Sequence, residues 1–368
     1  MHHGPLSSVR SSFAAAHRAA HDPCHRPGAR RALGIALFLL ALAGLVVFVL
    51  PQVADLEEAL RQARQGSPAW LGLAVALEAA SFLAYFALFH AAFRPGDAAI
   101  GWRESYVIPM ASLAAGRVIP GAGGVALTAW ALRRSGMAAA EVARRLVAFL
   151  VVLDGVYLAA LVLATAGLSL GLLSGPAPVY VTIVPALLAI LPIVAALALL
   201  LVPQERLDRR PAAAPESSRT RRLFERARSV PATVASGERG ALALVRDESS
   251  ALLAAVAWWG FDVATLWAVF AAFGEPPAIG VIAASYFVGQ LASALPLPGG
   301  LGGVEGGMIG AFMAFGVAAE LALVAVIVYR LLAYWLPSLP GIVAYFQLRQ
   351  TVSAWDSSRA QEPSGAAA

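Results

Sequence analysis

Residues 295–310 read L-P-L-P-G-G-L-G-G-V-E-G-G-M-I-G and have apolar sequence on both sides. Two prolines and seven glycines in these 16 residues disfavour a regular helix, because proline lacks an amide hydrogen and glycine loses the most backbone entropy on folding. In a bilayer, broken backbone survives only where protein or a water-lined cavity satisfies its amides and carbonyls. The stretch therefore predicts a broken helix that lines a cavity at membrane depth.

Two charged residues sharpen this expectation: Glu305 lies within the stretch, and Arg330 follows the next apolar segment. A charge near the bilayer centre costs roughly 2.5–3.5 kcal/mol on insertion scales, so it normally faces the interior of a helix bundle and has a partner. Both residues are thus candidates for a functional site. The alternative is that they pair with each other, or with other buried charges, only to hold helices together.

The composition of the whole chain supports a membrane location. Its 368 residues are 59% hydrophobic and 13% charged, with a mean hydropathy of +0.72, whereas ordinary soluble domains are roughly half apolar. A single cysteine, Cys24, excludes a disulfide framework. The histidines show no metal-ligand spacing, since five crowd the N-terminal tail and His90 stands alone. We expect an all-α polytopic membrane protein with no metal, no cofactor and no nucleic acid as a partner.

The apolar runs predict six full transmembrane helices and two re-entrant hairpins that are broken by proline and glycine. The second hairpin, 279–316, contains the opening stretch. The first, 106–132, is interrupted by Arg117, Pro120 and four glycines, and arginines at both ends place both ends on the cytoplasmic side. The full spans are expected at 32–50, 69–93, 146–172, 179–202, 251–273 and 321–348.

These runs divide the chain into a disordered cytoplasmic tail, a first membrane half, an Arg-rich cytoplasmic linker, a second membrane half and a C-terminal cytoplasmic tail, at residues 1–31, 32–202, 203–248, 249–348 and 349–368. The positive-inside rule places both termini in the cytoplasm. A cleaved signal peptide is the alternative for 32–50, although the run is long for one. Residues 219–228, R-T-R-R-L-F-E-R-A-R, form either a basic amphipathic helix on the inner leaflet or a solvated loop.

An external segment, 53–66, reads as a short surface helix with a Glu57/Arg61 pair at i,i+4. Its acids Asp55, Glu57 and Glu58 also allow a different interpretation, because carboxylates in a first external loop serve as metal ligands or bases in membrane-embedded enzymes. Interleaved arginines favour a solvated helix face.

An internal repeat is indicated by two pairs of matching segments. P-G-A-G-G-V at 120–125 matches P-G-G-L-G-G-V at 298–304, and G-M-A-A-A-E at 136–141 matches G-V-A-A-E at 316–320. Each repeat, the first at about 69–172, begins with a span that holds one acid, Glu78 or Asp262. The predicted topology inverts the two units, as in alternating-access transporters, although a purely structural duplication is the alternative.

The second repeat resembles a known family. L-P-L-P-G-G-L-G-G-V-E (295–305), G-V-A-A-E-L-A-L (316–323) and V-Y-R-L-L-A-Y-W-L-P (328–337) look like the signature of the lysylphosphatidylglycerol synthase transmembrane-region family, and the resemblance covers roughly 32–348. It implies the lipid-flipping membrane part of bacterial enzymes that aminoacylate phosphatidylglycerol, in a plasma membrane. The first repeat departs from the family by having Val125-Ala126 where members often carry an acid. Only residues 349–368 follow, so no aminoacyl transferase activity is expected.

The sequence therefore predicts a translocase, flippase or transporter for a lipid or amphiphile with a charged head group, anionic or glycolipid, and not an enzyme. Arginine binds phosphate in a bidentate way, and the buried carboxylates could receive an amine or a proton. The alternative is a membrane-embedded enzyme or accessory subunit acting on lipid-linked sugars. The expected cavity residues are Glu305, Arg330, Asp262, Glu78, Arg117 and Asp154. The motif residues are Pro298, Gly299, Gly300, Gly302, Gly303, Pro120 and Gly121.

Overall fold

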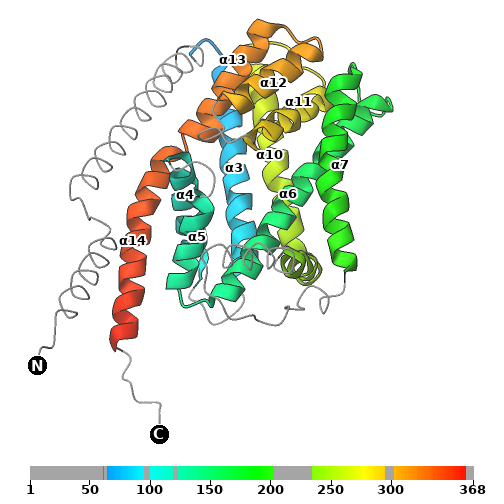
Figure 1. Cartoon of the computed structure of the whole chain (residues 1–368). Coiled ribbons are helices and arrows are strands. Elements are labelled where there is room, and N and C mark those ends of the chain that lie inside the picture. Colours follow the sequence, from blue (N-terminus) through cyan, green and yellow to red (C-terminus); the bar gives the residue numbers. More distant parts are fainter. Residues whose placement is uncertain are drawn as a thin grey trace, which may run out of the picture. The chain divides into compact units, whose positions relative to one another are not determined.

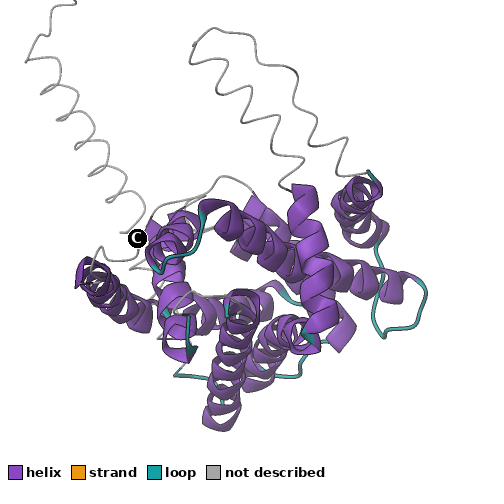
Figure 2. Cartoon of the chain, turned by 90° about the horizontal axis from the view of Figure 1, so that it is seen from below, coloured by secondary structure: helices purple, strands orange, loops and turns teal. Residues whose placement is uncertain are grey.

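The computed structural model describes residues 61, 64–94, 100–118, 123–202, 234–294 and 302–361, which belong to one compact unit. Within these ranges the secondary structure consists of helices joined by turns, with no strands (Figure 2). The predicted tail 1–31, the first span 32–50, the acids Asp55, Glu57 and Glu58, and the basic segment 219–228 lie outside the described residues.

Five helical segments are long and apolar enough to cross a membrane: α3 (Pro68–Phe93), α6 (Ala139–Ser169), α7 (Val179–Leu201), α10 (Ser249–Phe273) and Ala319–Arg359. They coincide with five of the six predicted spans, and the chain is a polytopic all-α protein. Helix α6 begins earlier than predicted, because Glu141 forms ion pairs with Arg144 (2.7 Å) and Arg145 in its first turns. Such i,i+3 and i,i+4 pairs stabilise a polar helical turn.

Two hairpins of shorter helices separate the long ones. The first is α4 (Trp102–Val118) with α5 (Gly123–Arg134), and the second is α11 (Ile279–Leu291) and η1 (Ala292–Ala294) with α12 (Gly303–Ala314). A single helix needs about 20 apolar residues to span a bilayer, and none of these helices is among the five that are long and apolar enough to cross. In Figure 1, α4 and α5 lie towards the lower ends of the long helices, and α11 and α12 towards the upper ends.

Glycines let the arms of each hairpin approach closely. A methyl group on Gly124 in α5 would lie 2.7 Å from the carbonyl oxygen of Ser112 in α4. In the second hairpin, a methyl group on Gly289 in α11 would lie 2.9 Å from the amide nitrogen of Met308 in α12. Small residues at helix contacts are typical of membrane proteins, where close backbone packing replaces the hydrophobic effect.

The last span differs from the single helix predicted at 321–348. Helix α13 (Ala319–Arg330) passes into a π-helical segment, η3 (Leu331–Trp335), before α14 (Ser338–Gln361) begins. Pro337 contributes to this change, because proline cannot donate the backbone hydrogen bond that a continuous helix requires.

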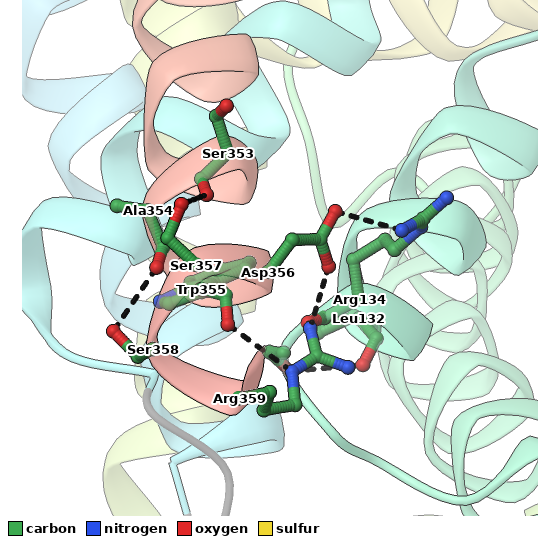
Figure 3. Close-up of polar contacts among 10 residues, drawn as sticks. Leu132, Arg134, Ser353, Ala354, Trp355, Asp356, Ser357, Ser358 and Arg359 are labelled. Carbon is green, nitrogen blue, oxygen red and sulfur yellow. Dashed lines mark hydrogen bonds and ion pairs between the residues drawn. The ribbon is translucent and has the colours of Figure 1, made fainter. Parts of the chain in front are cut away.

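Helix α14 also extends well into the segment 349–368, which was expected to be a tail. No glycine or proline interrupts the sequence between Gly341 and Gln361. Figure 3 shows the contact that holds this end against α5: Arg134 Nη1 donates to Asp356 Oδ2 at 2.7 Å, and Arg359 donates to Asp356 Oδ1 at 3.1 Å and to the Arg134 carbonyl. Residues 349–361 of the predicted cytoplasmic tail are therefore helical, because these tertiary contacts add to helix propensity.

Residues 234–247, the described part of the expected linker, are helical as well. A methyl group on Gly237 would lie 2.2 Å from Val147 Cγ1, so this helix lies directly on α6.

The core is organised around α3 and α10, which pack side by side. Ser81 Oγ in α3 donates to the carbonyl of Trp258 in α10 at 3.1 Å, and the Trp70 and Trp267 rings meet edge to face with centroids 5.3 Å apart. One buried cluster joins α10 to α6, α11, α12 and α13, and another joins α3 to α4, α6 and α14. The helices that carry Glu78 and Asp262 therefore lie at the centre of the described structure.

Candidate functional site

Two arginines from different helices share one aromatic ring. Arg117, in the last turn of α4, lies with its Cζ 4.4 Å from the centroid of the Tyr334 ring, and Arg330, the last residue of α13, lies 4.5 Å from it. Tyr334 belongs to the π-helical segment, and such segments are frequent at functional sites. We call Arg117, Tyr334 and Arg330 the arginine–tyrosine stack.

Glu305 connects this stack to the second hairpin. Arg330 Nε donates to Glu305 Oε1 at 2.6 Å, and the backbone amide of Gly302 donates to Glu305 Oε2 at 2.8 Å. Gly302 has φ +77°, a left-handed conformation that favours glycine, and it is the N-cap of α12. One carboxylate therefore caps a helix and neutralises a guanidinium. This explains why the motif combines glycine and glutamate at this spacing.

The stack holds more donors than acceptors. The side chains of Arg330 and Glu305 are 12% and 19% exposed, and Arg330 Nη2 is buried with no hydrogen-bond partner among the described residues. Arg117 Nη1 donates to the hydroxyl of Ser338 at the start of α14. Among the described residues, Glu305 is thus paired with Arg330, and no carboxylate contacts Arg117. A buried donor without a partner costs free energy until it is satisfied.

A second polar cluster lies where α3 meets α10. Glu78 is 5% exposed and Asp262 is 6% exposed, and their carboxyl groups are within hydrogen-bonding reach of each other. Asp262 Oδ2 accepts hydrogen bonds from the hydroxyls of Tyr286 in α11 and Tyr329 in α13, the latter at 3.1 Å. Glu78 Oε2 is buried with no donor among the described residues. We call Glu78, Asp262, Tyr286 and Tyr329 the carboxyl–tyrosine cluster.

The two groups adjoin. Tyr329 and Arg330 are consecutive in α13, and electrostatic interactions link Arg117 to Glu78 and Arg330 to Asp262. The structure therefore brings together five of the six predicted cavity residues: Glu305, Arg330, Asp262, Glu78 and Arg117.

Asp154 does not join them. It lies in α6 beside a cavity of about 570 Å³ that α6, α7 and the helix 234–247 line mainly with aliphatic side chains. Glu238 lines the same cavity, where burial raises the pKa of its carboxyl and Arg239 partly opposes that effect. The expectation that Asp154 is a nearby partner of Glu305 and Arg330 therefore fails, because this turn of α6 faces α7.

Gly302 and Gly303 form the start of α12, whereas Pro298, Gly299, Gly300, Pro120 and Gly121 lie outside the described residues.

The sequence reasoning missed the tyrosines. Tyr329 and Tyr334 lie within V-Y-R-L-L-A-Y-W, so their position close to Arg330 in the sequence could have identified them as site residues. Gln290 donates a hydrogen bond to the Tyr286 hydroxyl at 3.0 Å. Both residues lie in the apolar helix α11, where no neighbouring charge in the sequence marked them as site residues.

The long apolar helices, the paired short helices and the buried charges at their meeting point define a multi-pass membrane protein with a polar core. The family of the lysylphosphatidylglycerol synthase transmembrane region matches residues 31–341, so the chain belongs to that family. The resemblance noted in the second repeat is thereby confirmed.

Two curated relatives from Methanothermobacter thermautotrophicus are both described as UPF0104 membrane proteins. One is 42% identical over 88 residues, which is 23% of this chain and 25% of the relative. The other is 33% identical over 96 residues, which is 26% of this chain and 28% of the relative. The matches thus span about a quarter of the length of each relative.

Proposed function

We propose that the protein moves a lipid or related amphiphile with an anionic head group between the leaflets of a membrane. The observation that carries this proposal is the arginine–tyrosine stack, in which Arg330 Nη2 is buried with no hydrogen-bond partner among the described residues and only Arg330, of the two guanidinium groups, is paired with a described carboxylate, that of Glu305. A phosphate oxygen would satisfy that donor. Arginine is suited to this role because its planar fork binds phosphate at two points.

The arrangement of helices also supports movement. The stack comes from the end of α4 and the junction of α13 with the π-helical segment, and Glu305, which pairs with Arg330, comes from the start of α12. Parts of both hairpins therefore contribute. Sites formed by broken helices from two related halves are typical of alternating-access transporters. The predicted inverted repeat would make the two hairpins equivalent gates, and the family is named after the synthase of a phospholipid.

The test uses the purified full chain in liposomes that contain fluorescent phospholipids with anionic or zwitterionic head groups, or a fluorescent polyprenyl phosphate. The measurement is the fraction of each label that becomes accessible to a membrane-impermeant quencher. We expect transfer of anionic phospholipid or polyprenyl phosphate and little transfer of zwitterionic lipid. Equal rates with protein-free liposomes for every label would refute the proposal.

A pair of double variants separates binding from folding. Single removal of Glu305 or Arg330 leaves a buried charge unpaired, at a cost of roughly 3–5 kcal/mol, so it is uninformative. Glu305→Gln with Arg330→Gln removes both charges, and we expect a folded protein without transfer. The matched control, Arg134→Gln with Asp356→Asn, neutralises an exposed ion pair and should transfer lipid like the wild type. Transfer by the first double variant would make Glu305 and Arg330 a structural pair.

A further inference from the structure

We infer that the carboxyl–tyrosine cluster is a proton-binding site, in which Glu78 and Asp262 share one proton, and that this proton is the ion coupled to movement of the amphiphile. The coupling rests on the proposed function. The proton site itself rests on contacts in the structure.

The hydrogen-bond donors and acceptors around the two carboxyl groups favour a shared proton. Both tyrosine hydroxyls donate to Asp262 Oδ2, and Glu78 Oε2 has no donor among the described residues. Two ionised carboxylates at hydrogen-bonding distance in a buried site repel each other, and one of them retains a proton, as in carboxylate dyads. A proton on Glu78 turns one of its carboxyl oxygens into a hydrogen-bond donor, and an oxygen of Asp262 can accept that hydrogen bond. The tyrosines then stabilise the charge that remains on Asp262.

No cationic side chain among the described residues contacts the Glu78–Asp262 pair. The charged and titratable groups that face it are Tyr286 from α11, Tyr329 and Arg330 from α13, and Arg117 from α4. Both arginines contact other groups: Arg330 contacts Glu305 and Tyr334, and Arg117 contacts Ser338 and Tyr334. They stabilise a single negative charge on the pair from a distance and leave the second carboxyl to be neutralised by a proton.

The carboxyl–tyrosine cluster adjoins the arginine–tyrosine stack. Tyr329 and Arg330 are consecutive at the end of α13, and the π-helical segment begins at the next residue. Loss of the shared proton places a second negative charge beside Tyr329 and within electrostatic reach of Arg330. This charge draws Arg330 away from Glu305 or from a bound anion. The π-helical segment is the place where the backbone can absorb such a shift, because its hydrogen bonding already departs from the regular helix.

The test is infrared spectroscopy of the purified full chain in lipid nanodiscs, titrated from mildly acidic to alkaline pH, and it requires no transport. A protonated carboxyl has a C=O stretching band that a carboxylate lacks. We expect such a band in the wild type and its loss in Glu78→Gln, where the amide donates to Asp262 in place of the shared proton. Asp356→Asn, which removes an exposed carboxylate, should leave the band unchanged.

Two further results decide the proposal. The Tyr329→Phe variant loses one hydrogen-bond donor to Asp262, which makes the ionised form of Asp262 less stable. The C=O band of the protonated carboxyl should therefore persist to more alkaline pH. Persistence of the full band in a folded Glu78→Gln protein would overturn the proton site, and so would disappearance of the wild-type band when choline is replaced by sodium at constant pH. Because lipid transfer plays no part in the measurement, failure of the proposed function would leave the infrared result intact.

Discussion

Tyr334 is the residue on which the arginine–tyrosine stack depends. Its ring lies within 4.5 Å of two guanidinium carbons that come from helices far apart in the sequence. Cation–π contacts contribute about 0.5–2 kcal/mol each, and more when the groups are desolvated. The ring therefore holds two like charges close together without neutralising either of them; Glu305 pairs with Arg330, whereas no described carboxylate contacts Arg117.

We predict that Tyr334→Leu weakens transfer of the anionic lipid about tenfold, which corresponds to roughly 1.4 kcal/mol, because the arginines lose their common support. Tyr334→Phe retains the ring and should remain near the wild-type rate in the same quencher assay. Equal rates for the two variants would contradict a role for the ring. A lower rate in Tyr334→Phe than in Tyr334→Leu would assign the function to the hydroxyl.

At the scale of elements, the second hairpin depends on the contact between α11 and α12. Gly289 faces the backbone of Met308 so closely that a methyl group would lie 2.9 Å from its amide nitrogen, whereas Gly310 in α12 has open space around it. Backbone cannot move aside as the end of a flexible side chain can. The hairpin carries Glu305 on α12 and Tyr286 on α11, so its closure positions groups of both polar sites.

We predict that Gly289→Ala lowers the apparent unfolding temperature, because overpacking costs typically about 1–3 kcal/mol. Gly310→Ala should leave this temperature unchanged or raise it, since alanine favours a helix by roughly 1 kcal/mol over glycine. The measurement is thermal unfolding of the two purified variants in the same detergent. Destabilisation of both variants by a similar amount would show that the close contact is not the cause.

At the scale of the whole molecule, the orientation in the membrane is a prediction that cysteine labelling tests. In a Cys24→Ser background, Ser174→Cys places a thiol in the exposed turn between α6 and α7, and Ser358→Cys places one near the end of α14. The positive-inside rule predicts that the first faces out and the second faces the cytoplasm.

We expect an impermeant maleimide to label Ser174→Cys in intact cells and to label Ser358→Cys only after the cells are permeabilised. Pro215→Cys, in the Arg-rich segment, should behave like Ser358→Cys. Labelling of Pro215→Cys in intact cells would contradict the inverted repeat, because that argument requires the segment between the two halves to be cytoplasmic.

Run length and composition by themselves determined the helical spans. Apolar runs of about 20 residues must form helices in a bilayer, since each backbone amide and carbonyl has to be satisfied within its own segment. Hence α3, α7 and α10 begin and end within two residues of the predicted bounds. Prolines and glycines likewise indicated both hairpins, because their backbone preferences are local. The family was recognisable for a related reason: its motif is contiguous, and it includes Glu305 and Arg330.

Only the tertiary structure decided which polar groups meet. Glu78, Asp154 and Asp262 are each a lone acid in an apolar span, so no polar face in the sequence shows which way they point. The packing of α3 against α10 brings Glu78 to Asp262, whereas α6 turns Asp154 towards α7. The junction of α13 with the π-helical segment places Tyr334 between Arg117 and Arg330, which are far apart in the chain. Such contacts depend on how each helix is rotated about its axis and on which helices pack beside it. The local backbone preferences of the residues specify neither.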